Sequence, residues 1–414
     1  MFLCAHFSRA VVSQLQARCH TTAPPIMTIR EARNILLKMV GTSTDYGPNC
    51  MPSVSRVRKS QDELADRGMK DSYWEAIIPP GTDLTVRERY ITFQKGIRFG
   101  RIMEDLDTLA GCICYTHYSD PYVDPEDHAP VGIVTALVDR IELHNHVVSP
   151  YHDIKMTGHL TWAGTSSMEA TMNLEQEIND TWQKILSASF IMVARDPVTN
   201  RAAVVNRLVP NGPEEEALFR KGEASKVLRQ EEAKKILLKT PPSEEESLIV
   251  HDLFLQTIDT KGGTFKVRVK PPGSVWMEKS LLKNMIMCHP EQRNIHHKIF
   301  GGFLMRQAME VAWTTAALYS CKRPVLKVVD DIVFKKPVEI GSLLLLSSQV
   351  VYTHKSLMQI KVHAEVLDVD TGVRETTNDF HFTFDSQDEN LPRVIPKSYA
   401  EFMLYLDGKR HFES

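Results

Sequence analysis

The hydrophobic and polar positions in the second half of the chain predict one buried helix with strands around it. Residues 303–320 carry charge only at Arg306 and Glu310, and a helix that is apolar nearly all round has to be surrounded on nearly all sides. Runs rich in β-branched and aromatic residues predict the strands. These runs are residues 281–289 before the helix and residues 325–334, 342–353, 356–368 and 375–385 after it.

The last of these runs shows the period of a strand. Phe380, Phe382 and Phe384 alternate with His381 and Thr383, as expected for a sheet that buries one face. Several antiparallel strands wrapped around one helix hide the apolar surface of both. We therefore predict an α+β fold in which a curved antiparallel sheet wraps around a long central helix.

The first half of the chain repeats this pattern. Residues 97–117 (IRFGRIMEDLDTLAGCICYTH) resemble residues 298–320 (KIFGGFLMRQAMEVAWTTAALYS). A repeat of this length predicts two similar domains in tandem. Two shorter pairs of segments are also alike, namely 137–143 with 328–334 and 164–172 with 354–362, and an insertion at 118–130 in the first copy explains their smaller offset.

Charge and composition divide the chain further. Residues 213–235 are rich in Glu, Lys and Arg, which predicts a solvated linker helix or an arm that faces a partner. Before the first repeat we expect a short helix near 29–40 and a strand within 72–79. The predicted segments are a leader at 1–28, a first domain at 70–210, a linker at 211–247, a second domain at 248–395 and a C-terminal tail at 396–414.

The N-terminal segment has the composition of a targeting leader. Its first acidic residue is Glu31, whereas Arg9, Arg18 and Arg30 precede it. An amphipathic, basic and acid-free start is typical of a transit peptide and predicts the mitochondrial matrix; an N-terminus without a targeting role is the alternative. We expect no transmembrane helix, because no uncharged apolar run approaches the roughly eighteen residues that such a helix needs.

Overall composition argues against two further classes of protein. A formal net charge of -3 over 414 residues provides no global basic field, so we do not expect nucleic acid as a partner. The seven cysteines are scattered without a CxxC pair, so we expect neither a disulfide framework nor a structural zinc site. We expect Cys112 and Cys114 to be small core residues.

Residues 288–302, CHPEQRNIHHKIFGG, concentrate cysteine, histidine and glycine. Cys288 and His289 are adjacent, as are His296 and His297, and an extended backbone sends adjacent side chains to opposite sides. At most two ligands then converge, so we predict no metal site in this segment. The segment also lacks the GxxxxGK(S/T) motif of a P-loop, because no Lys-Ser or Lys-Thr follows its glycine pair.

The same segment ends on Gly301 and Gly302 at the start of the second predicted helix. The first backbone N–H groups of a helix have no partner within it and carry partial positive charge. Glycine lets a ligand approach them closely. This arrangement suits a carbonyl oxygen that becomes an oxyanion; the alternative is that the glycines only allow close packing of helix on sheet.

The helix of the first copy carries Glu104, Asp105 and Asp107, which we expect in its opening turns. The helix dipole is enough to explain acidic residues at such positions. Asp107 lies farther along, toward the face that we expect to be enclosed, where a partly desolvated carboxylate can act as a general base for water. The second copy has Met309 and Glu310 in that neighbourhood, so we expect the copies to contribute different parts of one site.

Two long motifs resemble the hotdog-fold acyl-coenzyme A thioesterases. They are HPEQRNIHHKIFGGFLMRQAMEVAW at 289–313 and VVDDIVFKKPVEIGSLLLLSSQV at 328–350. The shorter motifs RFGRIMEDLD, VTALVD, FIMVARD, VWME and MLYLDGKRHF extend the resemblance over roughly residues 70–412. The resemblance implies two tandem hotdog domains, a double hotdog, which act on an acyl thioester held between them and need no metal or cofactor.

The resemblance also implies the residues of the site. It carries the family's helix aspartate onto Asp107 and puts Lys298 where the family usually has a catalytic asparagine. Asn294 matches a second asparagine of that loop, while Lys298 is a candidate for holding a coenzyme A phosphate or polarising the thioester carbonyl. The phosphates of coenzyme A require cations, for which Arg293, Lys335 and Lys336 are candidates, although ordinary surface charge explains them equally well.

We predict an acyl-coenzyme A thioesterase of the mitochondrial matrix in which Asp107 helps to deprotonate water and the backbone at Gly301 and Gly302 holds the oxyanion. One alternative is a binding or regulatory module that has lost its chemistry. Another is a hydratase of enoyl thioesters that uses His289 or His297. Because the sheets of hotdog pairs have open edges, we also expect a homo-oligomer, a dimer or trimer of double hotdogs.

Overall fold

The computed structural model describes residues 26–40, 57–120, 129–143, 148–178, 181–232, 234, 236–259, 265, 268–293 and 298–413. Their backbone divides the chain into two compact units. Unit 1 comprises residues 1–136, 146–222 and 293–297, and unit 2 comprises residues 137–145, 223–292 and 298–414. The predicted leader at 1–28 lies almost wholly outside the described residues, as does most of the insertion at 118–130.

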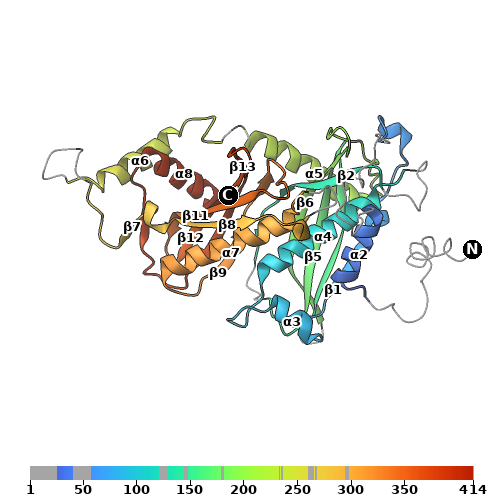
Figure 1. Ribbon diagram of the computed structural model, residues 1–414, viewed down its shortest axis with the longest axis horizontal. Helices are drawn as coiled ribbons and strands as arrows, with labels where there is room; N and C mark the ends of the chain where they lie inside the picture. Colours follow the sequence, from blue (N-terminus) through green and yellow to red (C-terminus); the bar gives the residue numbers. More distant parts are fainter. Residues whose placement is uncertain are drawn as a thin grey trace, which may run out of the picture. The chain divides into compact units, whose positions relative to one another are not determined.

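Unit 1 is built around the long helix α4, Phe99–His117. Its strands pair antiparallel in the order β1-β4-β5-β6, and α4 packs on all four of them (Figure 1). The remaining elements surround this core. They are α2 Ile29–Val40, η1 Gln61–Glu63, η2 Met69–Ser72, β1 Trp74–Ile78, α3 Leu84–Tyr90, β2 Gly132–Val138, β4 Ile154–Ala163, β5 Ser167–Ile178, β6 Thr181–Arg195 and α5 Pro213–Glu232, of which β2 and α5 cross the division between the units.

Helix α2 covers the side of α4 that the sheet leaves open. The two helices approach closely at Gly111, where a Cβ atom would lie 3.1 Å from Leu36 Cδ2. Nearly every residue of α4 is buried as a result, including Cys112 and Cys114. Burial raises the pKa of the Cys112 thiol to about 12, so the prediction that these two cysteines are core residues is confirmed.

Unit 2 repeats the arrangement around α7, Gly301–Ser320. Its strands pair antiparallel in the order β8-β11-β12-β13, and β9 pairs with β13 on the other side. The elements of this unit are β3 Ile141–Glu142, α6 Glu244–Leu255, β7 Ser274–Trp276, η3 Met277–Ser280, β8 Leu282–Met287, η4 Pro290–Gln292, β9 Val325–Val329, β10 Ile332–Phe334, β11 Leu343–His354, β12 Leu357–Leu367, β13 Arg374–Asp385, β14 Arg393–Ile395 and α8 Tyr399–Glu413.

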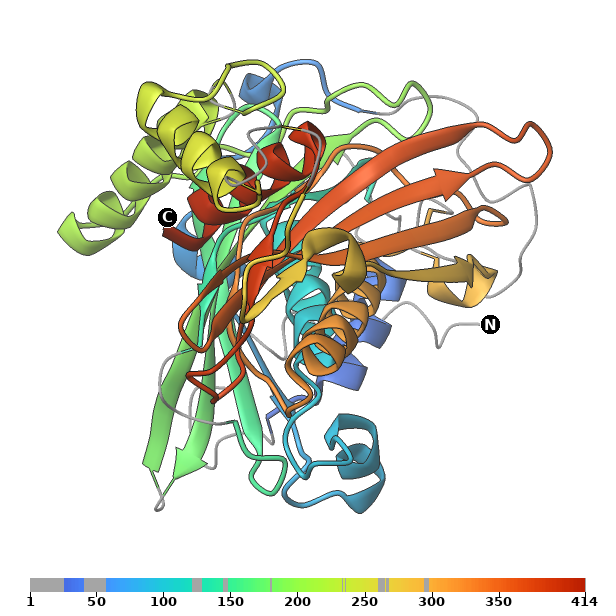
Figure 2. The ribbon, with the colours of Figure 1, turned by 90° about the vertical axis from the view of Figure 1, so that its left-hand side faces the viewer.

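The strands of unit 2 have a helix on each face. Helix α7 packs on one face of β11, β12 and β13, and α8 packs on the other (Figure 2). Phe380, Phe382 and Phe384 are fully buried, as predicted, but His381 and Thr383 on the alternate face are buried too. The prediction that this strand buries one face only is therefore wrong, because α8 covers the second face.

The expectation that α7 is enclosed on nearly all sides is also wrong for its last turns. Leu318 is 66% exposed. In unit 1 the helix α2 covers α4, whereas the helices that the structure describes leave the far side of these α7 turns open. A single sheet can enclose only one side of a helix, so full enclosure requires this additional layer.

Helix α8 follows the strands of unit 2 and lies within residues 396–414, which the sequence analysis predicts as a C-terminal tail. Its residues Phe402 and Leu406 are buried, and Phe402 packs with Leu253 of α6 and with Ile395. Gly408 faces β11, where an added Cβ would lie 2.5 Å from Val351 Cγ2 and 3.0 Å from Val351 Cβ. The helix therefore approaches the sheet too closely for any side chain at this position.

Replacing Gly408 tests this close approach. Alanine normally favours a helix over glycine by about 1 kcal/mol, but here its Cβ would overlap the fully buried Val351. We expect Gly408→Ala to lower the free energy of unfolding by about 1 to 3 kcal/mol, measured by urea denaturation. The loss should be smaller when Gly408→Ala is introduced into Val351→Ala, and an equal loss in both backgrounds would contradict the proposed contact.

Candidate active site

Asp107 lies on α4 and is enclosed by the surrounding elements, with 1% of its surface exposed. Thr135, on β2, donates a hydrogen bond from its hydroxyl to Asp107 Oδ1 over 2.5 Å. A buried carboxylate requires donors of this kind because it has lost water. The threonine hydroxyl therefore orients the Asp107 carboxylate on the helix.

The expectation that the three acidic residues of α4 lie in its opening turns is wrong for Asp107. The helix begins at Phe99 and has no acidic residue in its first turn. Asp107 therefore lies in the third turn, beyond the reach of the dipole at the helix end. Interactions with the helix dipole cannot explain its burial, which requires partners on other elements.

Glu104 and Asp105 have such partners, and theirs are cationic or phenolic. Arg101 donates to Glu104 at 2.9 Å. Asp105 accepts hydrogen bonds from the Tyr90 hydroxyl at 2.5 Å and from Arg33 at 3.3 Å. Burial raises the pKa of Asp105 to about 6, even though the charge of Arg33 and the Tyr90 hydrogen bond act to lower it. These contacts attach α4 to α2 and α3, so we assign a structural role to Asp105.

The second half of the predicted site includes the start of α7. Gly301 is the first residue of this helix, and Phe300 precedes it at the cap position. The Phe300 side chain makes no capping hydrogen bond. The first amide groups of a helix point outward and carry partial positive charge, which is the polarity that an oxyanion site requires.

The loop before α7 is described only in part. Asn294, His296 and His297 lie outside the described residues, so the predictions for Asn294 and for a hydratase based on His297 fall there too. His289 is exposed. Lys298 is bound to Glu339, with its ammonium nitrogen 2.5 Å from Glu339 Oε1, so this lysine has a carboxylate partner in the present conformation.

The three remaining cations predicted for the phosphates of coenzyme A lie at or near the surface. Lys335 donates to Asp379 at 2.8 Å and Lys336 donates to Glu375 at 2.7 Å. Arg293 is half-buried. Each lysine pairs with an acidic side chain of β13, which holds its ammonium group close to the sheet.

Sequence reasoning missed Thr135. It lies in β2, and its sequence separation from Asp107 gives no sign of contact because the intervening insertion separates the two elements. A threonine in a predicted strand is too common to indicate that its hydroxyl orients a catalytic carboxylate. Only the packing of β2 beside the third turn of α4 reveals the pair.

A long helix packed against an antiparallel sheet, present in both units, defines a hotdog protein. Residues 296–373 match the family model of the thioesterase superfamily. Acyl-coenzyme A thioesterase 9, mitochondrial, of Homo sapiens is 47% identical over 395 residues, which cover 94% of this chain and 89% of that protein. Acyl-coenzyme A thioesterase 2, chloroplastic, of Humulus lupulus is 34% identical, with 82% of this chain and 80% of that protein covered.

Among solved structures, an acyl-CoA hydrolase of Staphylococcus aureus in complex with butyryl coenzyme A, coenzyme A and coenzyme A disulfide is 26% identical. It covers 34% of this chain and 88% of that chain, with a TM-score of 0.33.

The chain belongs to the family of the mitochondrial acyl-coenzyme A thioesterases, and it is a thioester hydrolase. The prediction of an α+β hotdog fold is confirmed. The predicted mitochondrial location agrees with the names of the relatives from Homo sapiens, Mus musculus and Bos taurus. No helix in the described part of the chain has the length and apolar character needed to cross a membrane.

The pKa of Asp105 predicts how its contribution to stability changes with pH. Its folded-state pKa of about 6 exceeds the ordinary value of 3.8, so between these values the folded chain binds more protons than the unfolded chain. The stability due to this carboxyl is therefore greatest below pH 4 and declines as the pH rises through 6. We expect the free energy of unfolding of the wild type, relative to Asp105→Asn, to fall between pH 4 and 6.5.

Urea titrations of both proteins across this range provide the measurement. Subtracting the free energy of unfolding of Asp105→Asn from that of the wild type at each pH removes the contributions of ionisable groups that are independent of Asp105. A difference that increases with pH would show instead that Arg33 and Tyr90 keep Asp105 ionised.

Proposed function

We propose that this protein hydrolyses acyl-coenzyme A to a free fatty acid and coenzyme A in the mitochondrial matrix, with Asp107 as the general base. The observation that carries the proposal is the buried carboxylate of Asp107, oriented by Thr135. Family membership supplies the reaction, and the position of this acid on the central helix supports its assignment as the residue that activates water.

The chemistry follows from these groups. Asp107 accepts a proton from water as the water oxygen attacks the thioester carbonyl. Backbone N–H groups at Gly301 and Gly302 stabilise the resulting oxyanion in our proposal, which is supported by their position at the start of α7. The carbonyl then re-forms and the thiolate of coenzyme A leaves. Because a thiolate is a good leaving group, no strong general acid is required at this step.

The loop before α7 and three cationic side chains have further roles in the proposed reaction. Asn294 or Lys298 positions the water or the carbonyl in our proposal, and binding of substrate frees Lys298 from Glu339. Arg293, Lys335 and Lys336 contact the phosphates of coenzyme A. We also propose a homo-oligomer of double hotdogs, because the edge strand β8 exposes Met285 and Met287, and exposed apolar strand edges favour association.

Removing the proton acceptor tests the central assignment. Asp107→Asn keeps the shape of the side chain but removes its basicity, so we expect kcat to fall at least about a hundredfold. Release of free thiol from short, medium and long acyl-coenzyme A substrates, followed with a thiol reagent, is the measurement. A far-ultraviolet circular dichroism spectrum and an unfolding curve establish that the variant remains folded.

Two further variants make the Asp107 test specific. Thr135→Val should lower kcat less than Asp107→Asn does, because it removes only the orienting hydrogen bond, and Asp105→Asn should leave most of the activity in any variant that stays folded. If Asp107→Asn turned over substrate at the wild-type rate, Asp107 would have no part in the reaction. If Asp105→Asn lost activity as completely while remaining folded, the base would be Asp105 instead.

The proposed phosphate contacts predict a change in KM that depends on the substrate. Lys336→Gln should raise KM for acyl-coenzyme A by roughly two- to fivefold, the range expected for one exposed ion pair. KM for the matching acyl-N-acetylcysteamine, which has no phosphate, should stay unchanged. The exposed Lys279 provides the control variant Lys279→Gln. An equal change for both substrates would contradict a phosphate contact and point to altered folding.

A further inference from the structure

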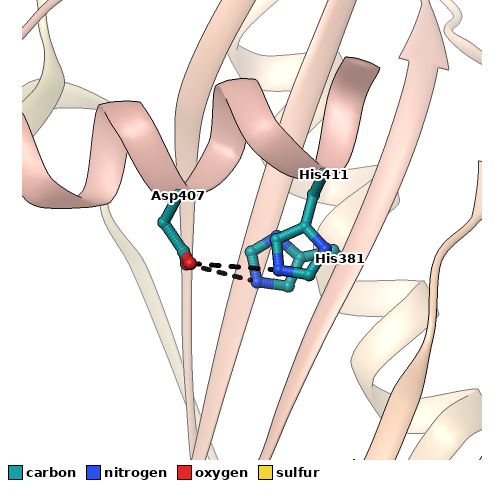
Figure 3. Close-up of side chains that lie close together, drawn as sticks. All are labelled: His381, Asp407 and His411. Atoms are coloured by element: carbon teal, nitrogen blue, oxygen red, sulfur yellow. Dashed lines mark ion pairs between the residues drawn. The ribbon is translucent and has the colours of Figure 1, made fainter. Parts of the chain in front are cut away.

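Three side chains with potential metal-ligating atoms meet between α8 and the outer face of β13. His381 extends from β13, and Asp407 and His411 extend from α8 (Figure 3). Asp407 and His411 are four residues apart, so they project from the same face of the helix. Within the described residues, these three form the group of histidine, cysteine or acidic side chains whose ligand atoms all lie within 4.8 Å of one another.

The distances in this group are those of ligands that share an ion. His381 Nε2 lies 3.6 Å from Asp407 Oδ2, and His411 Nε2 lies 3.9 Å from Asp407 Oδ1. Both exceed the usual N–H···O hydrogen-bond range of about 2.7 to 3.2 Å. Two ligand atoms held tetrahedrally at about 2.1 Å from one zinc ion are about 3.4 Å apart. Modest side-chain movement therefore suffices to place an ion among the three groups.

A second carboxylate fixes the tautomer of His411. Asp330 Oδ2 lies 2.6 Å from His411 Nδ1, and a carboxylate can only accept a hydrogen bond, so Nδ1 carries the hydrogen. In the neutral ring the lone pair is then on Nε2, which faces Asp407. A histidine ligand oriented by a carboxylate through its other nitrogen is a recurrent feature of metal sites in proteins.

His381 supplies an observation that does not depend on this carboxylate. The side chain is 2% exposed, and its Nδ1 atom is buried without a hydrogen-bond partner in the described part of the chain. Buried polar atoms are normally paired. The ring atom that faces Asp407 is the other nitrogen, Nε2, 3.6 Å from Oδ2, so the ring is turned with Nε2 toward the proposed ion while Nδ1 stays buried on the other side.

Lys361 is the group that competes with an ion for Asp407. Its ammonium nitrogen lies 2.8 Å from Asp407 Oδ2 and 4.0 Å from Asp379 Oδ1. Asp379 is therefore a second carboxylate within reach, already bonded to His363 Nδ1 at 2.7 Å. An ion on Asp407 would shift Lys361 toward Asp379, which keeps the lysine paired.

We propose that His381, Asp407 and His411 bind one divalent transition-metal ion of the zinc class, with water as a fourth ligand. Imidazole and carboxylate ligands suit such ions. The side chains of Asp407 and His411 are 24% and 33% exposed, which leaves a path for the ion and room for water. The two imidazole rings are stacked with centroids 3.8 Å apart, which places the two histidines next to each other beside Asp407.

The bound ion would tie the C-terminal helix to the sheet. Two ligands belong to α8 and one belongs to β13, so the ion contributes stability only while the helix is docked. The site therefore supplies a structural link, separate from the hydrolysis of the thioester.

Metal titration of the full chain tests the proposal. The protein is stripped of metal with a chelator, and zinc binding is measured by competition with a chromophoric chelator. Cobalt(II) serves as a second probe, because its visible absorption reports a four-coordinate site. We expect one zinc ion per chain, a higher midpoint of thermal unfolding with zinc, and affinity reduced at least about tenfold in His411→Gln and in Asp407→Asn.

A neighbouring histidine provides the matched control. His363 lies on the adjacent strand and bonds to Asp379 rather than to the three proposed ligands, so His363→Gln should bind zinc as the wild type does. Using the two variants on α8 avoids reliance on His381, whose replacement in the core is the most disruptive to folding. Equal zinc affinity in wild type, His411→Gln and Asp407→Asn would overturn the site. Binding without a rise in the unfolding midpoint would overturn the structural link.

Discussion

Enclosure of the central helix is the constraint on which the rest of this structure depends. The helix α4 lies between a curved sheet and α2, which removes nearly all of its surface from water. Burial of the apolar residues drives this arrangement, but it also strips water from every polar group on the helix. Each such group then requires a partner from another element, since an unpaired buried charge is costly.

The partners distinguish the acidic residues of α4. Glu104 and Asp105 face arginines, and Asp105 also faces a tyrosine. These contacts hold the helix in place and occupy the carboxylate oxygens. Asp107 accepts a hydrogen bond from the Thr135 hydroxyl on Oδ1, and this neutral donor orients the carboxylate. Its place on the central helix and its orientation by Thr135 are why we assign the chemistry to Asp107, whereas the contacts of Asp105 with α2 and α3 assign it a structural role.

In unit 2 the face of the strands that points away from α7 is also covered. Helix α8 covers it, so polar residues that alternate with the phenylalanines of β13 become buried. Charged and imidazole groups lie between helix and sheet, and Lys361 contacts both Asp379 and Asp407 there. The close approach at Gly408 brings the helix near enough for these side chains to meet.

Periodicity along the sequence by itself determined the elements and their repetition. The predicted helix at 303–320 is α7 at Gly301–Ser320, and the run at 356–368 is β12 at Leu357–Leu367, because apolar spacing is a local property of the chain. Tertiary structure alone decided which elements cover each face and which side chains meet. Arg33 with Asp105, Thr135 with Asp107 and His381 with Asp407 are far apart in sequence, and their contacts depend on packing that no local period records.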